Sequence, residues 1–214
     1  MPLTDVFDMR NPVSLFSLLV LWCLLLACAG AAKARPPALP EIPAPPEELL
    51  GSGVIPAKDL GAFLLEINPE AEKGFVEELA AYYVEEAALE GINHEVAFAQ
   101  MCLETGFLRF GGLVTPEMNN FCGLGALGPE RPGERFESPK IGVRAHIQHL
   151  KAYATESPLE QALVDPRYRY VRKGAAPTLD GLTGTWATDP AYAAKIRGIL
   201  ERLFVFYYGK RPAA

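Results

Sequence analysis

Apolar residues recur at helical spacing in three segments of the first half of the chain. The pattern predicts a short helix over residues 57–67, a longer helix beginning at Asn68-Pro69-Glu70 and running to about Leu89, and a third helix over residues 94–104. Asn68 and Pro69 are typical of a helix cap and a first helical position. Asn93 is a plausible cap for the third helix, and Gly106 stops it.

The second half begins with an irregular stretch. Residues 106–139 are rich in glycine and proline and lack helical periodicity, so we expect loops and a small hairpin at most. Helices are predicted over residues 140–155 and 159–164, and a last one starts at Asp189-Pro190, where Asp189 is expected to cap the helix rather than act as a base.

These elements predict a mainly α (α+β) fold, a helical domain with a small irregular or β-hairpin lobe. Strand–helix alternation and a glycine-rich phosphate loop are both missing from the sequence, which excludes a nucleotide-binding doubly wound sheet.

The N-terminus predicts export. Residues 13–32 are uncharged and rich in leucine, about the length that crosses a bilayer. Small residues follow, as a signal-peptidase site requires. Leu25-Leu26-Ala27-Cys28 resembles a lipobox, in which Cys28 would carry lipid. Three alternatives stay open for residues 1–34: a lipoprotein signal, a cleaved secretion signal and an uncleaved membrane anchor.

A proline-rich segment follows the apolar one. Residues 35–48 contain six prolines between Pro36 and Pro46 and predict a stiff, extended linker. The remaining residues, 49–214, form the predicted globular domain. An anchor, a spacer and a domain in this order indicate a protein of the cell envelope or periplasm, attached to the membrane or else secreted.

The net charge is −6, from 20 basic and 26 acidic residues. An acidic protein has no electrostatic reason to bind nucleic acid, so this class of partner is excluded.

The remaining cysteines and histidines do not predict a metal site. Cys102 and Cys122 would form a disulfide in an oxidising compartment or remain free thiols, and the sequence leaves both alternatives open. His146 and His149 share a helix face but lack further ligands at metal-binding spacing, so we interpret them as structural. No metal or other cofactor is expected.

Glu104 is the best candidate for a catalytic residue. It ends a largely apolar helix, where the helix dipole and apolar surroundings both disfavour a negative charge. Both effects would keep a proton on the carboxyl group near neutral pH, as a general acid for glycoside cleavage requires. A solvent-facing glutamate at a helix end is the alternative that these arguments leave open.

Three motifs resemble one family of enzymes. The segments AQMCLETGFL (residues 99–108), MNNFCGLGALG (118–128) and GTWATDPAYAAKI (184–196) are similar, in order and spacing, to the bacterial glucosaminidase domain, glycoside hydrolase family 73. The stretch at residues 164–177 is also similar to some clostridial-type members. The resemblance covers about residues 70–207. It implies a lysozyme-like fold, peptidoglycan glycan strands as substrate, hydrolysis of N-acetylglucosaminyl linkages and Glu104 as the general acid.

The motifs also suggest which residues surround the acid. Asn119 and Asn120 would offer amides to sugar groups, although turn formation is the alternative. Tyr192 is expected to support catalysis, and Trp186 to stack on a sugar or pack in the core. The expected substrate-binding set is Gln100, Asn119, Asn120, Phe121 and Trp186.

A second catalytic carboxylate is not evident, although glycosidases normally use a pair. Where many members of the family carry a glutamate, this chain has Ile141. Glu137 is the nearby substitute and Glu134 another, and assistance by the N-acetyl group of the substrate is an equal contender. The sequence therefore predicts an endo-β-N-acetylglucosaminidase acting on peptidoglycan, with a lytic transglycosylase or a non-catalytic murein-binding module as alternatives.

Overall fold

A computed structural model describes residues 41–210 of the chain. The predicted signal or anchor segment 1–34, with Cys28, lies outside the described residues, as do residues 35–40 of the predicted linker. Within the described part, no helix combines the length and the apolar character needed to cross a membrane.

The first three helices are α2 (Ala57–Ile67), α3 (Lys73–Glu90) and α4 (His94–Glu104). The bounds of α2 and α4 are as predicted, and the Asn93 side chain caps α4 by accepting from the backbone N–H groups of Glu95 and Val96. The left-handed Gly91 ends α3, with φ of 72°.

The predicted start of α3 at Asn68-Pro69 is wrong. Asn68 instead ends α2, and its side-chain amide donates to the Phe107 carbonyl at 2.7 Å. Glu72 caps α3 in its place, because its carboxylate accepts from the N–H groups of Gly74 and Phe75.

The later elements are the 3-10 turns η1 (Pro116–Met118) and η2 (Tyr168–Tyr170) and the helices α5 (Pro139–Ala154), α6 (Leu179–Leu182) and α7 (Tyr192–Gly209). Asp189 lies just before α7, and its carboxylate accepts from the Ala191 N–H at 2.9 Å. The mainly helical prediction is confirmed. The hairpin alternative is wrong, since residues 106–138 contain no strand and hold only the turn η1 and an isolated bridge between Gly128 and Arg131.

The predicted helix over residues 159–164 is also wrong. The Gln148 side chain on α5 binds this segment in a non-helical form: it accepts from the N–H groups of Val164 and Asp165 and donates to the Ala162 carbonyl. These side-chain hydrogen bonds replace those that a helix would have made.

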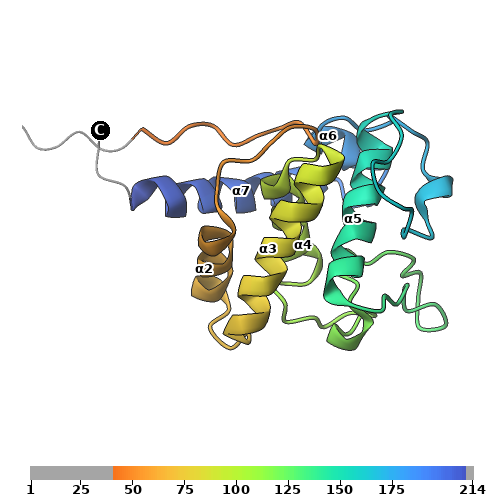
Figure 1. The fold of residues 1–214 in the computed structure, drawn as a ribbon, viewed down its shortest axis with the longest axis horizontal. Coiled ribbons are helices and arrows are strands. Elements are labelled where there is room, and N and C mark those ends of the chain that lie inside the picture. The colour runs from red at the N-terminus through yellow and green to blue at the C-terminus, as the bar shows by residue number, and fades with distance from the viewer. Residues whose placement is uncertain (1–40, 211–214) are drawn as a thin grey trace, which may run out of the picture. The chain divides into compact units, whose positions relative to one another are not determined.

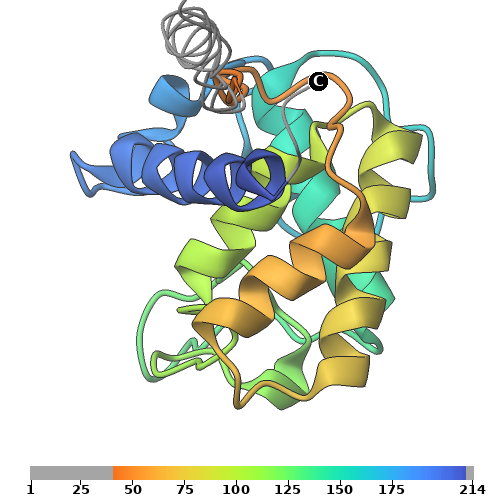
Figure 2. The same ribbon diagram turned by 90° about the vertical axis from the view of Figure 1, so that its left-hand side faces the viewer.

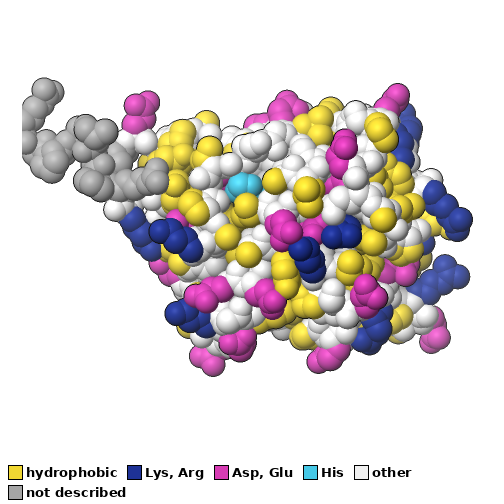
Figure 3. Space-filling model, in the orientation of Figure 1, with side chains coloured by type: hydrophobic (Ala, Val, Ile, Leu, Met, Phe, Trp, Pro, Cys, Tyr) yellow, Lys and Arg dark blue, Asp and Glu magenta, His cyan; other side chains and the backbone are white. Residues whose placement is uncertain are grey.

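The long helices pack around one another. Figure 1 shows α3 between α2 and α5, and α3 packs against both of them. Figure 2, turned by 90°, shows α7 crossing near α4, against which it packs. The outer face carries charges of both signs among apolar side chains (Figure 3).

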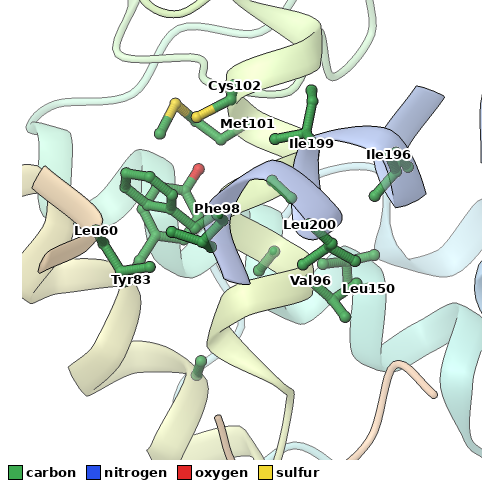
Figure 4. Close-up of a cluster of buried hydrophobic side chains, with 14 of the residues drawn as sticks. Leu60, Tyr83, Val96, Phe98, Met101, Cys102, Leu150, Ile196, Ile199 and Leu200 are labelled. Carbon is green, nitrogen blue, oxygen red and sulfur yellow. The ribbon is translucent and has the colours of Figure 1, made fainter. Parts of the chain in front are cut away.

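The core lies where α3, α4, α5 and α7 meet. Figure 4 shows Tyr83, Phe98 and Leu200 converging there from α3, α4 and α7. All three are fully buried, and the Tyr83 and Phe98 rings make an edge-to-face contact at 5.7 Å. Cys102 and Cys122 are both buried as free thiols, so the structure has the free-thiol form of the two alternatives.

Candidate functional site

Glu104 is the last residue of α4 and faces a cavity at the end of that helix. The helix stops at the left-handed Gly106, with φ of 58°, as predicted, and the Thr105 hydroxyl donates to the Met101 carbonyl at 2.8 Å. The chain then turns sharply, with positive φ angles at Phe107 and Leu108. Non-glycine residues rarely adopt this conformation, and it is held by packing against the core and by the bond from Asn68.

The cavity beside Glu104, the Glu104 cavity, has a volume of about 180 Å³. One wall is the glycine-rich segment after η1, where Gly123 adopts φ of 69° and lies so close that a Cβ there would be 3.8 Å from Glu104 Oε2. The lining residues are Glu104, Thr105, Phe110, Gly111, Gly112, Leu113, Val114, Asn120, Gly123 and Ala126.

The environment of Glu104 favours its protonated form. The residue is open to solvent on the cavity side, and the protein that surrounds the rest of the carboxyl group removes hydrating water. This desolvation raises the pKa of Glu104, and hydrogen bonds from Tyr192 and Trp186 oppose it without cancelling it. A raised pKa is what a general acid needs near neutral pH.

Tyr192, at the start of α7, donates its hydroxyl to Glu104 Oε1. Burial and the charge of Glu104 both raise the pKa of Tyr192, so the phenol keeps its proton. The hydroxyl oxygen of Tyr192 also accepts a hydrogen bond from Gln100 Nε2 at 2.8 Å. The sequence-predicted Gln100, Glu104 and Tyr192 are thus brought together.

Gln100 in turn connects to a buried histidine. His146 on α5 bonds Gln100 Oε1 through Nε2 and the Tyr83 hydroxyl through Nδ1, both at 2.9 Å. Burial lowers the pKa of His146 to about 3, so the ring is neutral. Because an amide oxygen only accepts, Nε2 carries the proton and Nδ1 accepts from Tyr83.

The four bonds therefore run in one direction: Tyr83 to His146, to Gln100, to Tyr192, to Glu104. Every donor points toward the carboxyl group, which fixes Tyr192 as a donor to it. Helices α3, α4, α5 and α7 all contribute, so the position of the acid depends on the whole helical packing.

A second cavity of about 270 Å³, the Trp186 cavity, adjoins the first. Trp186 forms part of its wall, with its ring centroid 5.1 Å from that of His149 and 5.6 Å from that of Tyr153. His149 Nδ1 bonds Asp165 Oδ2 at 2.7 Å. The lining residues are Cys122, Gly123, Leu124, Gly125, Ala126, Leu127, His149, Tyr153, Arg167, Tyr170, Val171 and Trp186.

The two asparagines organise the loop. Asn120 is 1% exposed, and its amide bonds both the N–H and the carbonyl of Leu124 and the carbonyl of Glu134. Asn119 is left-handed, with φ of 51°, and donates to the Phe136 carbonyl at 3.0 Å. These bonds match the turn-forming alternative, and the substrate contacts expected of both amides stay a prediction.

Three other predicted residues do not line the Glu104 cavity. Phe121 is 1% exposed and packs in the core, with its ring 6.3 Å from that of Phe75. Glu137 is exposed and lines neither cavity, and Glu134 packs beside Gly125. Neither glutamate joins Glu104 in its cavity.

The sequence does not reveal the connections of the histidines or the basic wall of the Trp186 cavity. His146 and His149 look structural in the sequence, but the structure links His146 to Glu104 through Gln100 and Tyr192 and places His149 in a cavity wall. The sequence signal for Arg167 is the family-like stretch at residues 164–177. In the described part of the chain, no group of three acidic, histidine or cysteine side chains is arranged to hold a metal ion.

The chain is similar to known proteins. The family model described as Glucosaminidase, mannosyl-glycoprotein endo-beta-N-acetylglucosaminidase, matches residues 80–204, more than half of the chain. The chain is also 43% identical, over 158 residues, to an uncharacterized protein of Borreliella burgdorferi, covering 74% of this chain and 78% of that protein. The matched region contains Gln100, Glu104, Trp186 and Tyr192, and the chain belongs to the glucosaminidase family.

Proposed function

We propose that the protein is an endo-β-N-acetylglucosaminidase that hydrolyses the glycan strands of peptidoglycan between N-acetylglucosamine and N-acetylmuramic acid. One observation carries the proposal: Glu104 has a raised pKa, opens onto a cavity, and receives a directed hydrogen bond from Tyr192. Family membership supports a glycoside hydrolase.

In this mechanism Glu104 donates its proton to the glycosidic oxygen as the bond to the anomeric carbon breaks. Tyr192 then stabilises the carboxylate that remains, because its hydroxyl already points at Oε1. Glu104 is the one carboxylate among the described residues that line the two cavities. This supports assistance by the N-acetyl oxygen of the substrate, which attacks the anomeric carbon before water completes hydrolysis.

The test is release of soluble muropeptides from purified murein by the full chain. Glu104→Gln removes the proton donor and is expected to lower the rate about 10²-fold or more. Glu130→Gln, an exposed glutamate in the same irregular region, is the matched control and should keep wild-type activity. Full activity of Glu104→Gln would contradict the proposal.

Glu137→Gln addresses the second carboxylate directly. Because Glu137 lines neither cavity, the substrate-assisted mechanism predicts little change in rate. A loss as large as that of Glu104→Gln would instead identify Glu137 as the base.

The single acid also suits a second candidate, a lytic transglycosylase on the same substrate, since that reaction needs one acid group. Mass spectrometry of the released fragments separates the two reactions: hydrolysis leaves reducing ends, and transglycosylation leaves 1,6-anhydro ends. Murein binding with no released product would identify a non-catalytic binding module.

We also propose that the domain acts outside the cytoplasm, in the cell envelope. The uncharged leucine-rich residues 13–32, the lipobox-like residues around Cys28 and the proline-rich linker support this proposal. Fractionation of cells that produce the full chain, with and without Cys28→Ala, tests both export and attachment through lipid on Cys28.

A further inference from the structure

We propose that the Trp186 cavity binds an acidic N-acyl amino sugar, with the sugar ring against its aromatic wall and a carboxylate on Arg167. The choice of sugar rests on the proposed function, because N-acetylmuramic acid and its peptide-bearing forms are the acidic sugars of peptidoglycan.

The cavity lies next to the proposed acid. It shares Gly123 and Ala126 with the Glu104 cavity. Trp186, in its wall, also lowers the pKa of Glu104. A glycan strand with one sugar at Glu104 would therefore place a neighbouring sugar in the Trp186 cavity.

Three aromatic side chains, Tyr153, Tyr170 and Trp186, line the cavity. Tyr170 is 60% exposed, with the guanidinium groups of Arg167 and Arg169 over its ring, and Trp186 is partly exposed. Such rings can pack against the C–H face of a pyranose while their polar atoms stay hydrated.

Arg167 supplies a positive charge that no acidic side chain pairs with in the described part of the chain. Its guanidinium lies 4.7 Å from the centroid of the Tyr170 ring. The nearby Asp165 is 1% exposed, and its oxygens accept from His149 Nδ1 and from the backbone N–H of Arg167. The guanidinium is therefore available for a ligand, with donors arranged to match a carboxylate.

The surroundings of Arg167 are basic although the protein is acidic. Residues 167–173 contain four basic side chains, and no acidic residue lines the cavity within the described part. Figure 3 shows Lys and Arg side chains (dark blue) projecting from the edge where Figure 1 places η2. This local charge favours an anionic ligand over a neutral one.

His149 adds a directional polar contact. Its Nδ1 is engaged by Asp165, which leaves Nε2 for a hydrogen bond with a sugar hydroxyl. Rings, a guanidinium and an imidazole together match the parts of an acidic amino sugar.

The carboxylate could come from two sources in peptidoglycan, the free lactyl group of a muramic residue without peptide or the acids of the stem peptide. Three ligands distinguish them: N-acetylmuramic acid has the lactyl acid, muramoyl dipeptide has only peptide acid, and N-acetylglucosamine has neither. None contains a glycosidic bond between sugars, so binding is measured without turnover.

The experiment is an NMR titration of the full chain, followed on the indole N–H signal of Trp186. The chain has two tryptophans, and Trp22→Phe assigns the signal. At least one acidic ligand is expected to bind about ten-fold more tightly than N-acetylglucosamine, as a charge-assisted hydrogen bond would give. Arg167→Gln should remove this preference. Arg172→Gln, an equal charge change in the same segment but outside the cavity, should keep it.

The relative affinities of the three ligands identify the carboxylate that binds Arg167. Preference for N-acetylmuramic acid assigns the lactyl acid, and preference for muramoyl dipeptide alone assigns the stem peptide. Equal binding of all three ligands, or equal losses in the two arginine variants, would overturn the cavity assignment. Selective binding without murein cleavage would overturn the proposed function alone, and cleavage without selectivity would overturn the cavity assignment alone.

Discussion

At the scale of single residues, the contact between Tyr192 and Glu104 determines how the acid behaves. The Tyr192 hydroxyl lowers the pKa of Glu104 against the larger effect of desolvation, which raises it. Tyr192→Phe removes this hydroxyl and is therefore expected to raise the pKa of Glu104 further. The basic limb of the pH profile of kcat should move to higher pH.

The same variant should be slower at its optimum. A hydrogen bond to a charged group contributes about 1.5–3 kcal/mol. Without the Tyr192 hydroxyl, the carboxylate that forms on Glu104 as it gives up its proton loses such a bond, so kcat is expected to fall about ten-fold or more. Tyr82→Phe, whose exposed hydroxyl bonds Glu78, is the control. A basic limb that moved to lower pH in Tyr192→Phe would contradict the role given to the hydroxyl.

Some of these residue roles follow from the sequence and some do not. Glu104 and Tyr192 were identified from motifs, since each lies in a short segment with a family pattern. His146 was not connected to them, because its partners Gln100 and Tyr83 lie 46 and 63 positions away and only the folded helices bring them together. The same is true of Asn119 and Asn120. From the sequence, an amide that hydrogen-bonds a sugar cannot be distinguished from one that hydrogen-bonds its own loop.

At the scale of elements, one glycine sets how closely α5 approaches the loop after η1. A Cβ on Gly142 would lie 1.7 Å from the Asn119 carbonyl oxygen, which is backbone and cannot rotate away. Gly142→Ala should therefore destabilise the fold by about 2 kcal/mol or more, although alanine is the better helix former.

Gly198 in α7 is the matched comparison. It lies in the helix interior, and a Cβ there meets no atom within 4 Å. Gly198→Ala is therefore expected to stabilise the protein by about 0.5–1 kcal/mol. Urea unfolding of both variants measures the two changes, and a Gly142→Ala variant as stable as Gly198→Ala would show that the approach of the loop is not tight.

Element boundaries are predicted well where local signals act alone, as at Asn93 before α4. The predicted boundaries are wrong where a residue far away in the sequence forms hydrogen bonds with the segment. Asn68 resembles a cap, but it bonds Phe107 across the fold, and the helical pattern at residues 159–164 yields to hydrogen bonds from Gln148. Periodicity does not reveal such competition, because the competing group is far away in the sequence.

At the scale of the whole molecule, buried ion pairs join α3 to α5. Glu90 is 2% exposed and accepts from Lys151 Nζ at 2.8 Å. Glu86 is fully buried and accepts from Arg144 Nε at 2.9 Å and from Gln161 at 2.9 Å. Because α5 carries His146 and α3 carries Tyr83, these pairs hold the two helices whose alignment the hydrogen-bond chain to Glu104 requires.

Glu86 makes the stability of this arrangement depend on pH. Burial alone would raise its pKa, but the hydrogen bonds from Arg144 and Gln161 and the charges of Arg144 and Lys140 outweigh burial, so the pKa lies below the ordinary value of 4.5. A carboxylate with a lowered pKa in the folded state stabilises the protein fully above its unfolded value. That contribution declines as the pH falls below 4.5 and through the folded pKa.

Glu86→Gln should therefore cost about 2 kcal/mol of unfolding free energy at pH 7, from the loss of charged hydrogen bonds. The difference from wild type should shrink when both proteins are unfolded in urea at pH values stepping down from 4.5, because protonated Glu86 in the wild type loses the same charge. Glu77→Gln removes an exposed partner of Lys73 at 3.6 Å and should change little at any pH. A difference between Glu86→Gln and wild type that stayed constant or grew in acid would show that the ion pair with Arg144 does not stabilise the helical packing around the acid.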